Sequence, residues 1–130
     1  MTWSKVEIRQ HGEDGQIYDM PSFFEDLEKF FSITKWHVDM DWCLGNRAGE
    51  LVKTLKASSG SLSDHDLRHF YEEIFQTVDG EFAGFKDDKY EVKLTAFDST
   101  LWILESDNQV FLNHMVKKYG LPQPLPTKGQ

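Results

Sequence analysis

Two histidines stand four residues apart in the segment His65-Asp66-Leu67-Arg68-His69. On a helix this spacing puts both rings on one face, the arrangement that zinc uses in the H-E-x-x-H motif. Asp66 takes the place of the glutamate here, and the apolar stripe through Leu67 turns both histidines toward solvent. A catalytic zinc also needs three protein ligands in a shaped pocket. We therefore interpret His65 and His69 as solvated helix residues, with metal binding as the alternative.

A second polar set, His37, Asp39 and Asp41, alternates with large apolar residues. Alternation predicts a strand that places all three on one face, with the two carboxylates about 7 Å apart. Such carboxylates could hold a divalent cation or act as a general acid and base. They could also form the solvated face of an antiparallel strand, which we favour, or contact a partner protein.

Nucleophilic catalysis finds little support in the sequence. Cys43 is the single cysteine, so an intrachain disulfide and any metal site built on cysteine pairs are excluded. We expect a buried or half-buried, inert thiol at the end of its strand, and a lone thiol fits a reducing compartment. The sequence contains neither a Walker loop nor a G-x-G-x-x-G motif. We predict no catalytic residues, no bound metal and no cofactor.

The elements that would position these residues follow from hydrophobic periodicity. We expect strands over 3–9, 36–43, 82–85, 90–96 and 101–104, and helices over 22–31, 48–55, 63–78 and 107–119. The predicted N-terminal helix caps are Ser22, Ser63 and Asp107. The third helix is predicted to end at Asp79-Gly80. Strand 101–104 is apolar without alternation, which predicts a central strand covered on both faces.

This order, β-α-β-α-α-β-β-β-α, predicts an α+β fold in which helices pack on a mostly antiparallel sheet of about five strands. Residues 1–120 form a single predicted domain, and 121–130 a proline-rich C-terminal tail. We expect Trp36 and Trp102 in the core, and Trp3 and Trp42 partly exposed.

Acidic residues dominate the charge of the chain. Asp and Glu number 22 against 14 Lys and Arg, a net charge of −8 over 130 residues. Such a charge disfavours direct binding to nucleic acid or to an anionic membrane and favours a basic protein partner. We see neither a signal peptide nor a membrane span, so we expect a cytoplasmic protein. The candidate partner-binding residues are exposed acids with one aromatic anchor: Asp39, Asp41, Trp42, Asp64, Asp66, Glu72, Asp87 and Asp88.

Two segments of the C-terminal half, QTVDGEFAGF (76–85) and FDSTLWILESD (97–107), carry a resemblance. Together they resemble small acidic immunity proteins of bacterial polymorphic-toxin and contact-dependent inhibition systems. The resemblance implies a non-enzymatic protein that binds and neutralises a cognate toxin, expected to be a basic nuclease. It assigns no functional residue, because Asp98, Ser99 and Trp102 look like turn and core positions. One alternative is a small metal-dependent enzyme or metal-binding protein that uses His37, Asp39 and Asp41, or His65 and His69. Another is a structural or adaptor subunit.

Overall fold

The computed structural model describes residues 2–120, and the predicted tail, 121–130, lies outside the described residues. Within this range six strands form one antiparallel sheet, in the order β1-β6-β5-β4-β2-β3. The α+β fold class is confirmed, with one strand more than the sequence predicted. The elements are β1 (Ser4–Arg9), α1 (Met20–Phe30), β2 (Lys35–Gly45), α2 (Ala48–Ala57), β3 (Ser61–Ser63), α3 (Asp64–Phe70), β4 (Ile74–Lys86), β5 (Lys89–Phe97), β6 (Leu101–Ser106) and α4 (Gln109–Tyr119).

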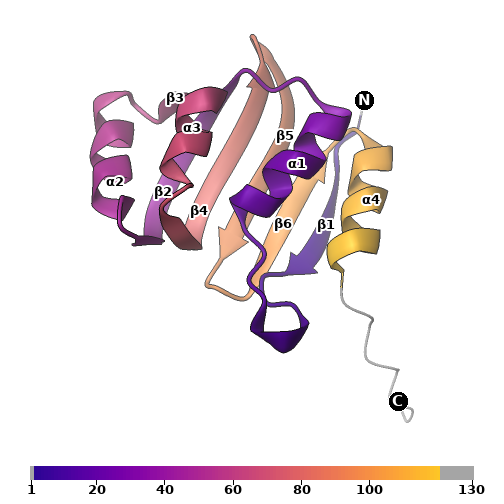
Figure 1. Ribbon diagram of the computed structural model, residues 1–130. Coiled ribbons are helices and arrows are strands. Elements are labelled where there is room, and N and C mark those ends of the chain that lie inside the picture. Colours follow the sequence, from indigo (N-terminus) through magenta and orange to yellow (C-terminus); the bar gives the residue numbers. More distant parts are fainter. Residues whose placement is uncertain (1, 121–130) are drawn as a thin grey trace.

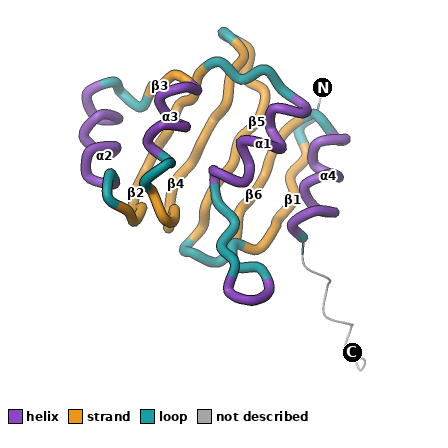
Figure 2. The backbone as a smooth tube through the Cα atoms, viewed as in Figure 1, coloured by secondary structure: helices purple, strands orange, loops and turns teal. Residues whose placement is uncertain are grey.

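All four α-helices lie on the same side of the sheet, as Figures 1 and 2 show from that side. The core lies between the two layers. Phe23 of α1 stacks edge-on against Trp102 of β6, with ring centroids 5.1 Å apart, and Trp36 of β2 is also buried there. The positions expected for Trp36 and Trp102 are therefore confirmed. Among residues 2–120 no helix is long and apolar enough to cross a lipid bilayer.

Strand β6 corrects one expectation. Trp102 and Leu104 are buried, but Leu101 and Ile103 are only partly buried. Successive side chains of a strand point to opposite faces, so Trp102 and Leu104 pack under the helices and the other two lie on the uncovered face. The prediction that both faces of this strand are covered is wrong, because an apolar run can also line a half-open sheet.

The predicted helix over 63–78 is wrong in its second half. Helix α3 ends at Phe70, and β4 begins at Ile74. Thr77 pairs with Cys43 of β2 in the sheet, and its backbone N–H donates to the Asp19 carboxylate at 2.6 Å. These long-range contacts override the local helical periodicity. Asp79 and Gly80 accordingly lie inside a strand and do not end a helix.

Two predicted helix caps shift by a few residues. Asp19, and not Ser22, caps α1, since its carboxylate accepts from the Met20 N–H at 2.7 Å. Asn108, and not Asp107, caps α4 by accepting from the Phe111 N–H at 3.0 Å. Ser63 caps α3 as predicted. The short strand β3 was not predicted; its three residues pair with the start of β2.

A buried carboxylate holds α4 on α1. The Asp26 side chain is 0% exposed and accepts hydrogen bonds from His114 Nε2 at 2.8 Å and Lys118 Nζ at 2.9 Å. The Tyr119 hydroxyl donates to its other oxygen. Burial raises the pKa of Asp26, but the three donors outweigh burial and leave this pKa below its usual value. Asp26 is therefore a structural anion, and one helix supplies all three of its donors.

Candidate functional site

One face of the sheet has no helix over it in residues 2–120, and this open face is the candidate functional surface (Figure 1). Successive side chains of a strand point to opposite faces of the sheet. Residues next to those that are buried under the helices therefore lie on the open face. The pairing register then arranges them in rows across the sheet. One row, in sheet order, consists of Glu7, Ile103, Thr95, Glu81 and Asp39.

The last two members of this row are both acidic. Asp39 of β2 lies directly opposite Glu81 of β4, and both are exposed. Side chains in such a pair have Cβ atoms about 4.5–5.5 Å apart, and like charges there destabilise the sheet. Lys93 compensates Glu81, with Nζ to Oε1 at 3.2 Å, but Asp39 has no ion pair within residues 2–120. The structure thus holds an uncompensated carboxylate against a second one.

The neighbouring row is aromatic. Trp42 pairs with Asp79, and because Gly80 pairs with Ala96, Asp79 lies beside Phe97. Trp42 and Phe97 are 57% and 56% exposed. The register shifts between Met40 and Trp42, a β-bulge that breaks simple alternation. Two large apolar side chains therefore flank an acidic one on the uncovered face.

We call these residues the β2–β4 patch: Asp39, Asp41, Trp42, Asp79, Glu81 and Phe97. Asp41 is exposed at the bulge. Asp79 also has a local role, since its carboxylate accepts from the Asp98 N–H at 2.8 Å. That bond supports the β5–β6 turn, in which Asp98 and Ser99 have φ of 52° and 57°. The sequence pattern predicted a turn at these two residues, and the structure confirms it.

The predicted partner-binding residues fall into three separate places. Asp39, Asp41 and Trp42 lie together on β2. Asp64 and Asp66 begin α3, and Glu72 follows it, so this group lies on the helix side. The third group, Asp87 and Asp88, forms the β4–β5 turn.

Several of the other predicted acids already have partners within the chain. The Asp64 carboxylate accepts from Trp36 Nε1 at 2.7 Å and from Arg68 Nε at 2.8 Å. Asp88 lies 3.4 Å from the Lys35 ammonium group. The β2 group differs, because neither Asp39 nor Asp41 forms an ion pair in the described part of the chain.

Sequence reasoning missed Asp79, Glu81 and Phe97 as candidates. The first two were assigned to a helix end and a loop, so their alternation with the buried Gly80 and Phe82 was not used. That period-two pattern was the available signal. Their position opposite β2 depends on register, which the sequence does not state.

Neither candidate metal-binding set, His37 with Asp39 and Asp41 or His65 with His69, has the geometry of a metal centre in residues 2–120. Across residues 2–120 no three His, Cys, Asp or Glu side chains come close enough together to hold a metal ion. His37 lies against the turn after α2, where a Cβ on Gly60 would stand 2.7 Å from its Nε2. His65 and His69 are exposed on α3, and His69 lies 3.5 Å from Glu72.

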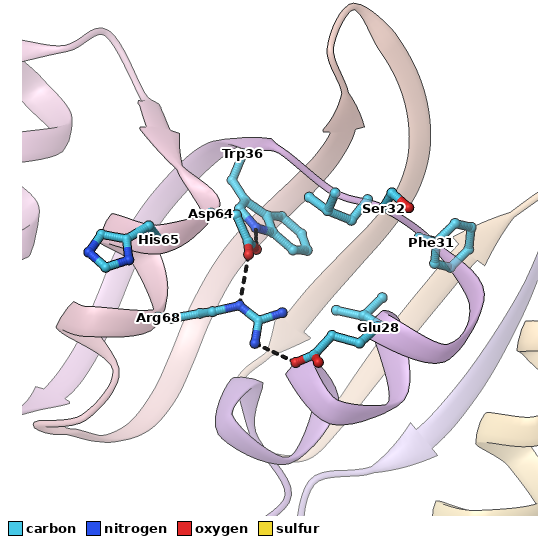
Figure 3. A pocket seen from close by; sticks show the side chains of 9 residues that line it. Glu28, Phe31, Ser32, Trp36, Asp64, His65 and Arg68 are labelled. Atoms are coloured by element: carbon cyan, nitrogen blue, oxygen red, sulfur yellow. Dashed lines mark hydrogen bonds and ion pairs between the residues drawn. The ribbon is translucent and has the colours of Figure 1, made fainter.

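A groove of about 520 Å³ lies between α1 and α3 on the helix side. Figure 3 shows Arg68 reaching from α3 toward Glu28 of α1, past the edge of the Trp36 ring. The guanidinium group donates to Glu28 at 2.6 Å and stands 4.8 Å from the Phe24 ring centroid. Since Arg68 forms ion pairs with both Glu28 of α1 and Asp64 of its own helix, we interpret this contact as one that holds the two helices together. The lining is Leu27, Glu28, Phe31, Ser32, Ile33, Trp36, Asp64, His65 and Arg68.

Cys43 is buried in the core between the sheet and the helices, in agreement with the expectation of a buried or half-buried thiol. Burial, together with the nearby charge of Asp19, raises the pKa of its thiol to about 11. A thiol of this kind is a poor nucleophile at neutral pH.

Comparison with known protein families, with curated proteins and with solved structures found no match.

Proposed function

We propose that this chain is a cytoplasmic immunity protein that binds and blocks a cognate bacterial toxin, a basic nuclease. The observation that carries the proposal is the open face of the sheet, on which Trp42 and Phe97 are exposed among carboxylates. Exposed aromatic residues within a charged surround are typical anchors of protein interfaces. An enzyme of small molecules would instead be expected to place such residues around an enclosed pocket.

The net charge of −8 supports the same reading. A nuclease must bind phosphates, so the rim of its active cleft is basic. A negative inhibitor is attracted to that cleft, and such attraction raises association rates toward roughly 10⁸–10⁹ M⁻¹s⁻¹ at low salt. Apolar contacts made after the encounter then slow dissociation.

The direct test uses the toxic terminal domain of a secreted protein encoded beside this chain. Both proteins are purified, binding is measured by calorimetry, and cleavage of nucleic acid by the domain is followed as the chain is added. We expect a stoichiometric complex and loss of cleavage at one equivalent. Cleavage that continues unchanged at a large excess of the chain would reject the proposal.

Salt dependence supplies a second test of the same function. Association driven by opposite charges slows steeply as ionic strength rises, because the Debye length falls to about 8 Å at physiological salt. The dissociation rate should change little. An association rate that is independent of salt would argue against electrostatic attraction.

A further inference from the structure

We propose that the β2–β4 patch is the surface that binds the partner, and that it takes an arginine-bearing segment with a guanidinium group between Asp39 and Glu81. This inference rests on the proposed function and adds the location and chemistry of the contact.

The two carboxylates occupy an unfavourable position in the free protein. Asp39 and Glu81 face each other on adjacent strands, where a Thr or an oppositely charged pair would be more stable. Residues that lower the stability of the fold and have no structural role are characteristic of functional surfaces. A cation placed between the two carboxylates removes their repulsion. The free energy that this repulsion costs the free protein therefore favours formation of the complex.

Charge is distributed unevenly along the open face. Toward β1, charges of opposite sign face each other, since Glu105 lies opposite Lys5 on one side and Lys93 on the other. Toward β2 they do not, because Asp39, Asp41, Asp79 and Glu81 lie together and Lys93 reaches only Glu81. The negative potential is therefore concentrated at one end of the face. A basic occupant complements this end, whereas nucleic acid would be repelled.

The side chains of the β2–β4 patch suit arginine better than lysine. A guanidinium group carries five donors in a plane and can bind two carboxylates while its flat face stacks on an aromatic ring. Trp42 is exposed one row away from the two carboxylates, and Phe97 lies across Asp79 from it. A lysine ammonium group would reach the carboxylates but would use the ring less well.

The test uses a short arginine-rich peptide as the probe, titrated at low salt into the full chain labelled with nitrogen-15. We expect the largest chemical-shift changes at the backbone amides of Asp39 and Glu81 and at the Trp42 indole N–H. A lysine peptide of equal length should bind more weakly. Shift changes spread evenly over all acidic segments would overturn the proposal.

Matched double variants make the test quantitative. Asp39→Asn with Glu81→Gln removes the facing carboxylates and should weaken peptide binding about tenfold, the loss expected for two partly exposed charge pairs. Asp66→Asn with Glu72→Gln makes the same change of charge on the helix side and should leave binding within about twofold. Equal losses in both variants would overturn the proposal.

Asp39→Asn alone keeps the Lys93–Glu81 ion pair and should unfold at a higher denaturant midpoint than the unsubstituted chain, because it relieves the repulsion between Asp39 and Glu81. The same denaturation measured on the double variant shows whether it is folded, and an unchanged or lower midpoint for Asp39→Asn would show that the two carboxylates do not repel each other.

The two proposals can fail separately. If the toxin domain is bound and inhibited but Asp39→Asn with Glu81→Gln changes nothing, the patch is wrong and the function stands. If the arginine peptide binds at the patch but no neighbouring toxin is inhibited, the assigned function is wrong and the arginine site stands.

Discussion

Thr77 of β4 gives both of its donors to the carboxylate of Asp19. The backbone N–H donates to Oδ2 at 2.6 Å and the hydroxyl to Oδ1 at 2.8 Å. Both residues are buried, and the Tyr71 hydroxyl adds a further bond to the Thr77 hydroxyl oxygen at 2.6 Å. Since Asp19 also caps α1, one carboxylate sets the start of a helix and the position of a strand 58 residues away.

Replacing this carboxylate should therefore cost stability. We expect Asp19→Asn to lower the free energy of unfolding by about 1–3 kcal/mol, because the amide group of Asn turns a donor toward donors that are buried. Urea denaturation measures the loss. The control is Asp87→Asn in an exposed turn, expected within about 0.5 kcal/mol of the parent chain. Similar values for the two variants would show that the Asp19 network contributes nothing.

Asp26 should make the stability of the protein fall at acid pH. Its pKa is lower in the folded chain than the ordinary value of 3.8. The charge on Asp26 therefore stabilises the fold above pH 3.8, and this contribution is lost as the pH falls below that value toward the folded pKa. Urea denaturation from neutral pH to below pH 3.8 follows the loss.

Asp26→Asn is the matching variant. It should cost about 1–3 kcal/mol at neutral pH, reduced because water reaches His114 and Lys118. It should also flatten the acid part of the stability profile. An acid profile as steep as that of the parent chain would assign the effect to other carboxylates.

The facing carboxylates predict a stabilising substitution. Asp39→Thr should raise the free energy of unfolding by about 0.2–1 kcal/mol, since it removes a like-charge pair and introduces a good strand former. Added salt should shrink the gain. Asp41→Thr is the control at the bulge, where no residue of β4 is directly opposite. An equal gain at both positions would point to strand propensity alone.

Two glycines should respond to alanine with opposite signs. A Cβ on Gly84 would lie 3.0 Å from Trp36 Cζ3 and 3.0 Å from Val92 Cγ1, so Gly84→Ala should cost about 1–3 kcal/mol through overpacking. Gly49, on α2, has nothing within 4 Å of such an atom. Gly49→Ala should stabilise the chain by up to about 1 kcal/mol. Thermal or urea unfolding of both variants distinguishes the cases, and a stabilised Gly84→Ala would contradict the packing.

Cys43 should react with thiol reagents only when the protein unfolds. A thiol pKa of about 11 leaves a thiolate fraction on the order of one in ten thousand at pH 7, and burial restricts access further. Labelling with iodoacetamide should be slow in buffer and fast in denaturant. Fast labelling of the folded chain would show that the strand end around Cys43 opens readily.

The residues that repeat every second position were the predictable part of this fold. The alternation in β2 and β5 and the turn at Asp98-Ser99 follow from local patterns alone. The segment after Phe70 was not, because Ile74 and Val78 continue a helical spacing by coincidence. The contact between Thr77 and the distant Asp19 determines that this segment is a strand. A local sequence pattern cannot predict a contact between residues so far apart.

The sequence could place some residues of the candidate surface, and the others required the structure. Asp39, Asp41 and Trp42 share one strand, so their neighbourhood could be predicted from the sequence. Glu81 and Phe97 join them only through the pairing of β2 with β4 and of β4 with β5. A shift of one residue in either pairing would move those side chains to the helix side, so their place required the structure.

Strand β1 pairs with β6, and Ser4 lies opposite Ser106. During synthesis on the ribosome, β1 therefore cannot pair with β6 until nearly the whole described chain has emerged. Closing so long a loop is slow. Strands β2, β4 and β5 are synthesised before that moment. A nascent molecule can thus display its acidic surface before its last helix has been made.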